Sequence, residues 1–281
     1  MTRIPGGALG RFLVLTFAVT WICFTTVAAL AIPAHAPLGA LLLLLGAFAP
    51  GLVALWLTAR ADGSTSVRAL LGRTLQWRVA APWYLFAVGY IAAIKLAVAL
   101  VHRMVSGAWP RFGDEPWYLI PAAIVVSTPF QAGEELGWRG YALPRLTRRF
   151  GLARASILLG LIWAGWHLPQ FFIRESDTYG QSFVVFVLQV TALSVAMAWL
   201  YAHTNGSLLL VMLMHAAVNN SKDIVPSALP HGTNAFGLSA SLVAWLTVTL
   251  LWICAAYFLA RMPGWDARGD VHGSELPRWS G

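Results

Sequence analysis

Apolar segments long enough to cross a lipid bilayer recur along this chain of 281 residues. A membrane-spanning helix needs roughly 20 mostly apolar residues. The sequence offers eight such candidates, at 12–32, 39–59, 80–101, 118–139, 153–173, 182–202, 206–220 and 238–260. The fourth candidate is unusual because it carries charge, and the seventh is short for a full crossing. These segments predict an all-α, polytopic membrane helix bundle with about eight transmembrane helices, forming a single integral membrane domain over residues 1–281.

The composition excludes a soluble enzyme or a disordered regulator. Hydrophobic residues make up 58% of the chain and charged residues only 11%, and the mean hydropathy is +0.68. Soluble domains are about 45–50% apolar and about 25% charged. Thirty charged residues cannot cover a soluble protein of this length. We therefore expect a multi-pass integral protein of the cell membrane, with the lipid bilayer as its surroundings.

The basic residues predict an orientation in the membrane. With both termini in the cytoplasm, the inner side collects thirteen of the nineteen Lys and Arg residues, and the outer side collects four. The outer four are Arg103, Arg111, Arg174 and Lys222, while Lys95 and Arg139 fall within candidate helices. Cytoplasmic loops are enriched in Lys and Arg. The net charge of +8 is therefore interpreted as a record of topology, and no nucleic-acid partner is expected.

Two polar segments flank the apolar ones. Residues 140–150 have two readings: a cytoplasmic loop with snorkelling arginines, or a continuation of the fourth helix that breaks near Pro144. The C-terminal tail, 262–281, is polar and contains Pro and Gly, so we expect it to be disordered.

Few ionisable side chains fall inside the apolar segments. Glu134 and Glu135 are the two acidic residues there, and His167 and His215 are the histidines that lie well inside a segment. A charge in hydrocarbon is unfavourable by about 2.5–3.5 kcal/mol on insertion scales, so such residues are rare and usually functional.

Helical spacing groups these residues. Residues four apart share a helix face, which pairs Glu135 with Arg139 and His215 with Asn219. Glu134 points about 100° away from Glu135, so it lacks that arginine partner and is free to face a cavity. Each pattern alone has a structural interpretation, an intramembrane ion pair or a histidine bonded between helices. Together they suggest hydrolysis of an amide bond, in which a carboxylate activates water and an imidazole and an amide stabilise the oxyanion.

Three motifs carry a resemblance to a known family. Glu134 to Arg139 reads E-E-x-x-x-R, Trp163 to His167 reads [FW]-x-x-x-H, and His215 to Asn219 reads H-x-x-x-N. In this order, over residues 117–222, they resemble the CPBP (Abi) family of intramembrane proteases, which includes the type II CAAX prenyl endopeptidases. Trp163 stands where Phe is commoner. The resemblance implies that 117–222 is the catalytic core.

The resemblance also implies roles for six residues. Glu134 matches the glutamate that activates water, and His167 matches the histidine that helps to hold it. His215 and Asn219 match the pair that stabilises the oxyanion. Glu135 and Arg139 match supporting positions of the first motif.

A metal requirement stays open at this point. Glu134, His167 and His215 could serve as a zinc set of two histidines and one carboxylate, but a metal-free glutamate mechanism uses the same residues. The chain has no H-E-x-x-H motif, which slightly favours the metal-free form. No cofactor is therefore certain, and zinc is the one considered.

The depth of the motifs adds one structural prediction. If the fourth helix ended at Arg139, Glu134 would lie near the cytoplasmic edge, and His167 would lie about 21 Å from the start of the fifth helix. The two could not meet. We therefore predict that the fourth helix runs on toward Pro144 or beyond, with the site inside the membrane and open toward the cytoplasm.

The leading hypothesis is thus an intramembrane endopeptidase acting on membrane-associated proteins or peptides. One branch of the resembled family acts on prenylated CAAX proteins, but no residue here selects that substrate. A proton-coupled transporter is one alternative, since intramembrane Glu, His and Lys also serve proton relays. A non-catalytic membrane protein of the bacteriocin-immunity type is another.

Overall fold

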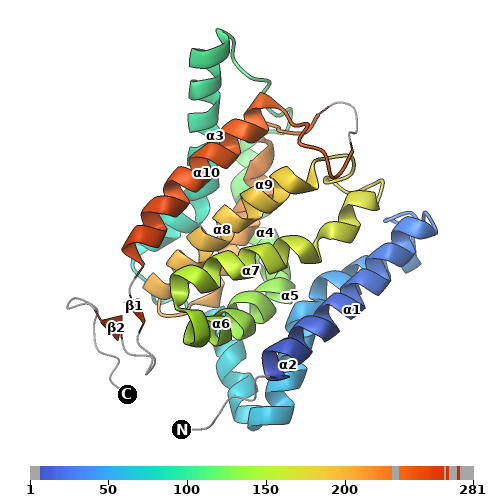
Figure 1. Cartoon of the computed structure of the whole chain (residues 1–281), viewed down its shortest axis with the longest axis vertical. Helices are drawn as coiled ribbons and strands as arrows, with labels where there is room; N and C mark the ends of the chain where they lie inside the picture. The colour runs from blue at the N-terminus through green and yellow to red at the C-terminus, as the bar shows by residue number, and fades with distance from the viewer. Residues whose placement is uncertain (1–6, 230–233, 263, 266–270, 273–281) are drawn as a thin grey trace.

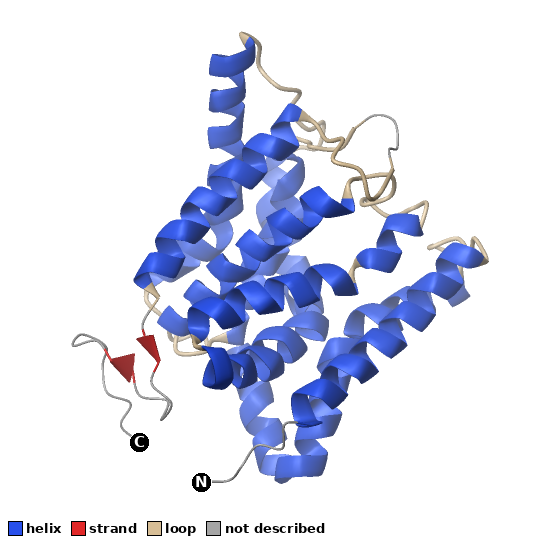
Figure 2. Cartoon of the chain, in the orientation of Figure 1, coloured by secondary structure: helices blue, strands red, loops and turns tan. Residues whose placement is uncertain are grey.

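The computed structural model describes residues 7–229, 234–262, 264–265 and 271–272 (Figure 1). Ten α-helices make up this part of the chain (Figure 2). They are α1 (Gly7–Ala29), α2 (Pro37–Gly72), α3 (Ala81–Ser106), α4 (Ile120–Ser127), α5 (Ala132–Gly137), α6 (Leu143–Phe150), α7 (Leu152–Trp166), α8 (Phe183–His203), α9 (Leu208–Ser221) and α10 (Leu242–Arg261). The prediction of an all-α membrane helix bundle is confirmed.

Short elements complete the described chain. The 3₁₀ turns are η1 (Arg73–Leu75), η2 (Trp117–Leu119), η3 (Thr128–Gln131), η5 (Leu168–Phe172) and η6 (Lys222–Ile224), and η4 (Trp138–Ala142) is a π-helical turn. A two-residue antiparallel pair joins β1 (Gly264–Trp265) to β2 (Val271–His272). The other residues expected in a disordered tail, 263, 266–270 and 273–281, lie outside the described residues.

Six helical segments of the described chain are long and apolar enough to span a membrane. They are Gly7–Ala29, Pro37–Leu75, Ala81–Ser106, Leu152–Phe172, Phe183–His203 and Leu242–Arg261. The two remaining candidates also form helices. Segment 118–139 is divided among η2, α4, η3, α5 and the start of η4, and α9, the candidate expected to be short, has 14 residues.

The fourth predicted helix does run on past Arg139. The backbone stays helical from α5 through η4 into α6 and ends at Phe150, so the loop interpretation of 140–150 is wrong and the prediction of a long helix is confirmed. Pro144 has no N–H to donate to the carbonyl of Gly140, four residues earlier. A widened π turn at η4 ends where α6 begins, one residue before this proline.

Glycines bring α2 and α5 into close contact. A Cβ added to Gly137 would lie 2.6 Å from backbone atoms of Pro50, and one added to Gly133 would lie 2.8 Å from the Phe48 ring. Gly51 faces the carbonyl of Gly133 at 2.8 Å by the same measure. Without side chains at these positions the two backbones meet, and the pair Glu134–Glu135 between the glycines is held in a fixed rotation.

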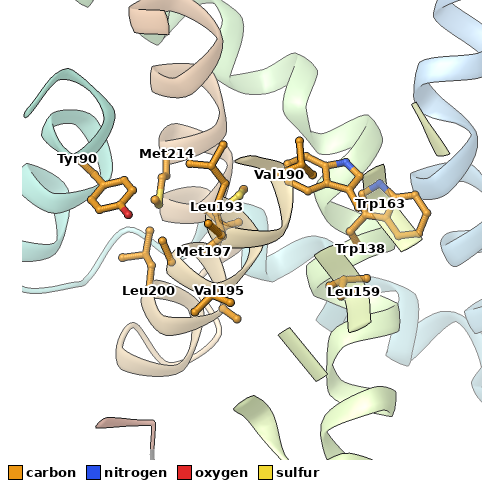
Figure 3. Close-up of a cluster of buried hydrophobic side chains, with 14 of the residues drawn as sticks. Tyr90, Trp138, Leu159, Trp163, Val190, Leu193, Val195, Met197, Leu200 and Met214 are labelled. Carbon is orange, nitrogen blue, oxygen red and sulfur yellow. The ribbon is translucent and has the colours of Figure 1, made fainter. Parts of the chain in front are cut away.

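A large apolar cluster fills the centre of the bundle (Figure 3). Helix α8 runs through it, with a run of buried residues from Val190 to Ala198. On one side, Trp138 packs edge-on against Phe12 and Trp166, with ring centroids 5.6 and 5.8 Å apart. This cluster ties η4 and α7 to α1 and so supports the polar residues on the same segments.

The two ends of the bundle carry different charge. Helix α1 begins and α10 finishes at the same end of the bundle (Figure 1). The segments at this end carry ten described arginines and one acidic residue, Asp62. The arginines are Arg11, Arg60, Arg68, Arg73, Arg78, Arg145, Arg148, Arg149, Arg154 and Arg261. We call this the arginine-rich end. The other end, here the acidic end, carries Arg103, Arg111, Arg174 and Lys222 with Asp114, Glu115, Glu175, Asp177 and Asp223.

The α2–α5 contact generates a stability prediction. Gly137→Ala places a methyl group against the backbone of Pro50, which cannot move aside, so we expect the free energy of unfolding to fall by roughly 1–3 kcal/mol. Thermal melts in detergent measure the effect. Gly10→Ala is the matched control, because an added Cβ there meets nothing within 4 Å and alanine favours the helix. Equal melting temperatures for the two variants would contradict the close contact.

Candidate active site

Residues from all three sequence motifs line one cavity. Glu134 lies on α5, His167 directly follows α7, and His215 and Asn219 lie on α9. All four border a cavity of about 550 Å³ enclosed mainly by α3, α8, α9, α10 and the segment 170–182. The structure therefore brings together the four residues that the sequence suggested for catalysis.

Trp163 holds the Glu134 side chain. Its indole Nε1–H donates to Oε2 of Glu134 at 2.7 Å. Among the described residues, the other carboxylate oxygen of Glu134 has no hydrogen-bond partner, and the residue borders the cavity. One oxygen is thus anchored while the other is available to a bound molecule.

Glu135 lies behind the cavity wall and joins an arginine to a histidine. Its carboxylate is fully buried and accepts from Arg139 Nη1 at 2.9 and 3.1 Å. It also lies 2.8 Å from Nδ1 of His215. Arg139 is equally buried, and its guanidinium lies 4.2 Å from the centre of the Trp163 ring. The expected i,i+4 ion pair is present, and it reaches a histidine on a different helix.

The partners of the two histidines distinguish their ring nitrogens. Nδ1 of His167 lies 2.8 Å from the carbonyl oxygen of Trp163. A carbonyl only accepts, so this nitrogen carries the proton, and Nε2 of the neutral ring is an acceptor. Nδ1 of His215 faces the Glu135 carboxylate and carries a proton for the same reason. When His215 is protonated, its Nε2 is a second donor.

Aromatic rings enclose the histidines. His167 lies with its centroid 4.6 Å from the Trp166 ring and 5.3 Å from the Phe186 ring. The Trp163 ring is edge-on to both His167 and His215, at 5.5 and 5.3 Å. Apolar walls of this kind restrict water around the polar groups and strengthen their electrostatic interactions.

Sequence reasoning left Lys95 out of the site, because an intramembrane lysine more often snorkels or pairs, but the residue also borders the cavity. The residue is 3% exposed, and its ammonium donates to the carbonyl of Val225 at 3.1 Å. Its position in the middle of an apolar segment was the available signal. By contrast, Asn220 bonds Ser127 and the Ala216 carbonyl, and His203 bonds the Trp199 carbonyl, so both have structural partners.

The cavity opens at the acidic end of the bundle. Of the residues that line it, the exposed ones are Asp177, Asn219, Asp223 and Ala228, all at this end. The sequence analysis placed both the basic residues and the opening of the site on the cytoplasmic side. The two cannot share a side, because the opening and the arginine-rich end lie at opposite ends of the bundle. The reason lies in the chain direction, since α7 and α9 both start at the arginine-rich end and carry His167 and Asn219 near their far ends.

A small ion-pair cluster borders the opening. Lys222 donates to Asp177 and to Asp223, each at 2.8 Å, and so links the segment after η5 to the end of α9. Partial burial lowers the pKa of Lys222, but the bonds to the two carboxylates outweigh it, and the net pKa is raised. The ammonium therefore stays charged at neutral pH.

The residues do not fit a resident zinc ion in this arrangement. A structural or catalytic zinc needs at least three closely grouped protein donors. Within the described ranges, no three His, Cys, Asp or Glu side chains are grouped so as to hold a metal ion, and Glu134, His167 and His215 form no such set.

Comparison with known proteins agrees with these motifs. Residues 113–221 match the family described as type II CAAX prenyl endopeptidase Rce1-like. A protein of Methanococcus maripaludis named CAAX prenyl protease 2 is 26% identical over 227 residues, covering 75% of this chain and 82% of the relative. The matched region contains every residue of the three motifs.

The buried junction at Glu135 generates a prediction about folding. Glu135→Gln leaves the buried Arg139 without its counter-ion, so we expect the free energy of unfolding to fall by about 3–5 kcal/mol. Arg139→Met alone leaves the Glu135 carboxylate with His215 as its one remaining partner. The double variant Glu135→Gln/Arg139→Met removes both charges. We expect its loss of unfolding free energy to be smaller than the sum of the losses in the two single variants. Unfolding curves of the four proteins measure this coupling, and strict additivity would contradict it.

Proposed function

We propose that the chain is a member of the CPBP family of intramembrane proteases, which the matched region 113–221 supports, and that its cavity hydrolyses peptide bonds of membrane-associated proteins or peptides. One observation carries the proposal. Glu134, His167, His215 and Asn219 come from three separate segments and border the same cavity. They supply acceptors for a water molecule and donors for an oxyanion, the two requirements of amide hydrolysis.

Glu134 and His167 are the groups proposed to activate water. The free oxygen of Glu134 and Nε2 of His167 are both hydrogen-bond acceptors, given the partners of Oε2 and Nδ1. A water molecule that donates to both turns a lone pair toward the substrate carbonyl. Glu134 takes the proton as the water attacks, and it then passes that proton to the departing amine nitrogen.

His215 and Asn219 are the groups proposed to stabilise the oxyanion. The imidazolium of His215 donates from Nδ1 to Glu135, which leaves Nε2–H for the substrate oxygen. The Asn219 amide offers a second donor one helical turn away on the same face. Preorganised donors of this kind act where negative charge develops.

Glu135 and Arg139 are proposed as positioning residues. Neither borders the cavity, but Glu135 fixes the ring of His215, and Arg139 neutralises the second carboxylate so that two adjacent glutamates can be ionised together. With Glu134 and Glu135 ionised and His215 protonated, the two negative charges equal the two positive charges of Arg139 and His215.

The first test isolates the reacting carboxylate. Glu134→Gln keeps the side-chain shape and an acceptor for Trp163, but it cannot take a proton, so we expect cleavage to be lost while the protein folds. The measurement compares new protein termini in cells that carry the wild type or the variant at equal levels. Glu115→Gln, at an exposed site of the acidic end, is the matched control and should retain the wild-type termini.

The two outcomes separate the hypotheses. Termini that are present with the wild type and Glu115→Gln, and absent with Glu134→Gln, identify substrate and cleavage site together. The same termini in all three samples, with every protein folded, would sink the proposed role of Glu134. That result would favour a transporter or a non-catalytic protein on this scaffold.

The oxyanion role generates a second test. Asn219→Ala removes one donor, and we expect kcat on an identified substrate to fall by roughly 10²–10³-fold. Because Asn219 is exposed, the melting temperature should change little. A proportional loss of folded protein and activity, with kcat per folded molecule unchanged, would contradict the assignment.

A further inference from the structure

The charge on the two ends of the bundle orients the molecule in the membrane. The described residues of the arginine-rich end include ten arginines and a single acidic residue, whereas the acidic end has four basic and five acidic residues. Positive residues in short loops near the ends of spans are retained on the cytoplasmic side. By this rule the arginine-rich end faces the cytoplasm.

The cavity opens at the opposite end. Its exposed lining residues, Asp177, Asn219, Asp223 and Ala228, all lie on the acidic end. Contacts between loops confirm that these segments share one end: Lys222 bonds Asp177, and the amide of Gly113 bonds the carbonyl of Ile224. At the arginine-rich end, Gln76 donates to the carbonyl of Thr204 at 3.2 Å and so ties the segment after η1 to the end of α8.

We propose that the site is reached from the extracytoplasmic face, and that its substrate is a protein or peptide segment presented on that face. The inference rests on the proposed function and narrows it, because a prenylated C-terminus in the cytoplasm would meet the arginine-rich end, opposite the opening of the cavity. The substrate class is thus an exported or membrane-inserted polypeptide whose cleaved bond lies near the outer surface.

The lining below the opening indicates the character of the segment that enters. Past the polar residues of the mouth, apolar side chains of α3, α8 and α10 border the cavity, among them Ile91, Val190, Leu193 and Leu251. An apolar stretch of the substrate can replace water against these side chains. We therefore infer a segment that is apolar beside the cleaved bond and comes from the outer leaflet or the surface above it.

Cysteine labelling tests the orientation independently of catalysis. Cys23 and Cys254 are replaced by alanine, and single cysteines are introduced as Ala228→Cys at the cavity mouth, Glu115→Cys elsewhere on the acidic end, and Ser64→Cys on the arginine-rich end. Intact cells are treated with a membrane-impermeant maleimide. We expect Ala228→Cys and Glu115→Cys to be labelled at once and Ser64→Cys only after permeabilisation. The reverse pattern would overturn the proposal.

The substrate side is tested by the location of the cleaved bonds. Termini that depend on Glu134 should map to extracytoplasmic segments or to the outer ends of membrane spans. Termini on cytoplasmic prenylated proteins would overturn the proposal while leaving the protease assignment intact. Labelling does not depend on catalysis, so we expect the same pattern in the Glu134→Gln protein. An incorrect orientation can therefore be distinguished from an incorrect proposed function.

Discussion

The carboxylate of Glu135 is the junction on which the site depends. It binds Arg139 on its own helical segment and His215 on α9, and all three side chains are buried. Removing the charge would leave the buried guanidinium of Arg139 without a counter-ion and Nδ1 of His215 without its carboxylate partner. The ion pair therefore does more than neutralise an arginine, because it fixes which edge of the His215 ring faces the cavity and holds α5 against α9.

Breaks in regular helix are what allow this arrangement. In a uniform helix over 118–150, the depth of the two glutamates in the membrane would follow from their position along the helix alone. Instead, η3 and the π turn at η4 bracket the six residues of α5, and the glycines of α5 press its backbone against α2. Apolar packing of Trp138 and Trp166 then supports η4 from the other side. The polar residues sit on the irregular part of the bundle, and the regular spans enclose them.

Much of this could be predicted from the sequence, for identifiable reasons. Spans are readable from apolar length, and the Glu135–Arg139 and His215–Asn219 pairs follow from helical spacing. The long helix past Arg139 followed from the depth that Glu134 and His167 must share. The bond from Glu135 to His215, the anchoring of Glu134 by Trp163 and the place of Lys95 in the cavity depend on how separate helices pack. That the cavity opens at the end opposite the arginine-rich one could not be predicted for the same reason, since it depends on loops that join distant segments.

Trp163 contacts nearly every polar group of the site. Its indole N–H bonds Glu134, its backbone carbonyl bonds His167, and its ring covers Arg139 and meets His215 edge-on. A phenylalanine could supply the ring and the carbonyl but not the N–H, and the oxygen of Glu134 would then need a water molecule in place of the indole. The identity of this one aromatic residue thus decides whether the carboxylate oxygen is bonded to an indole or to a water molecule. Chains that share all three motifs can therefore differ in the number of water molecules bound to the glutamate.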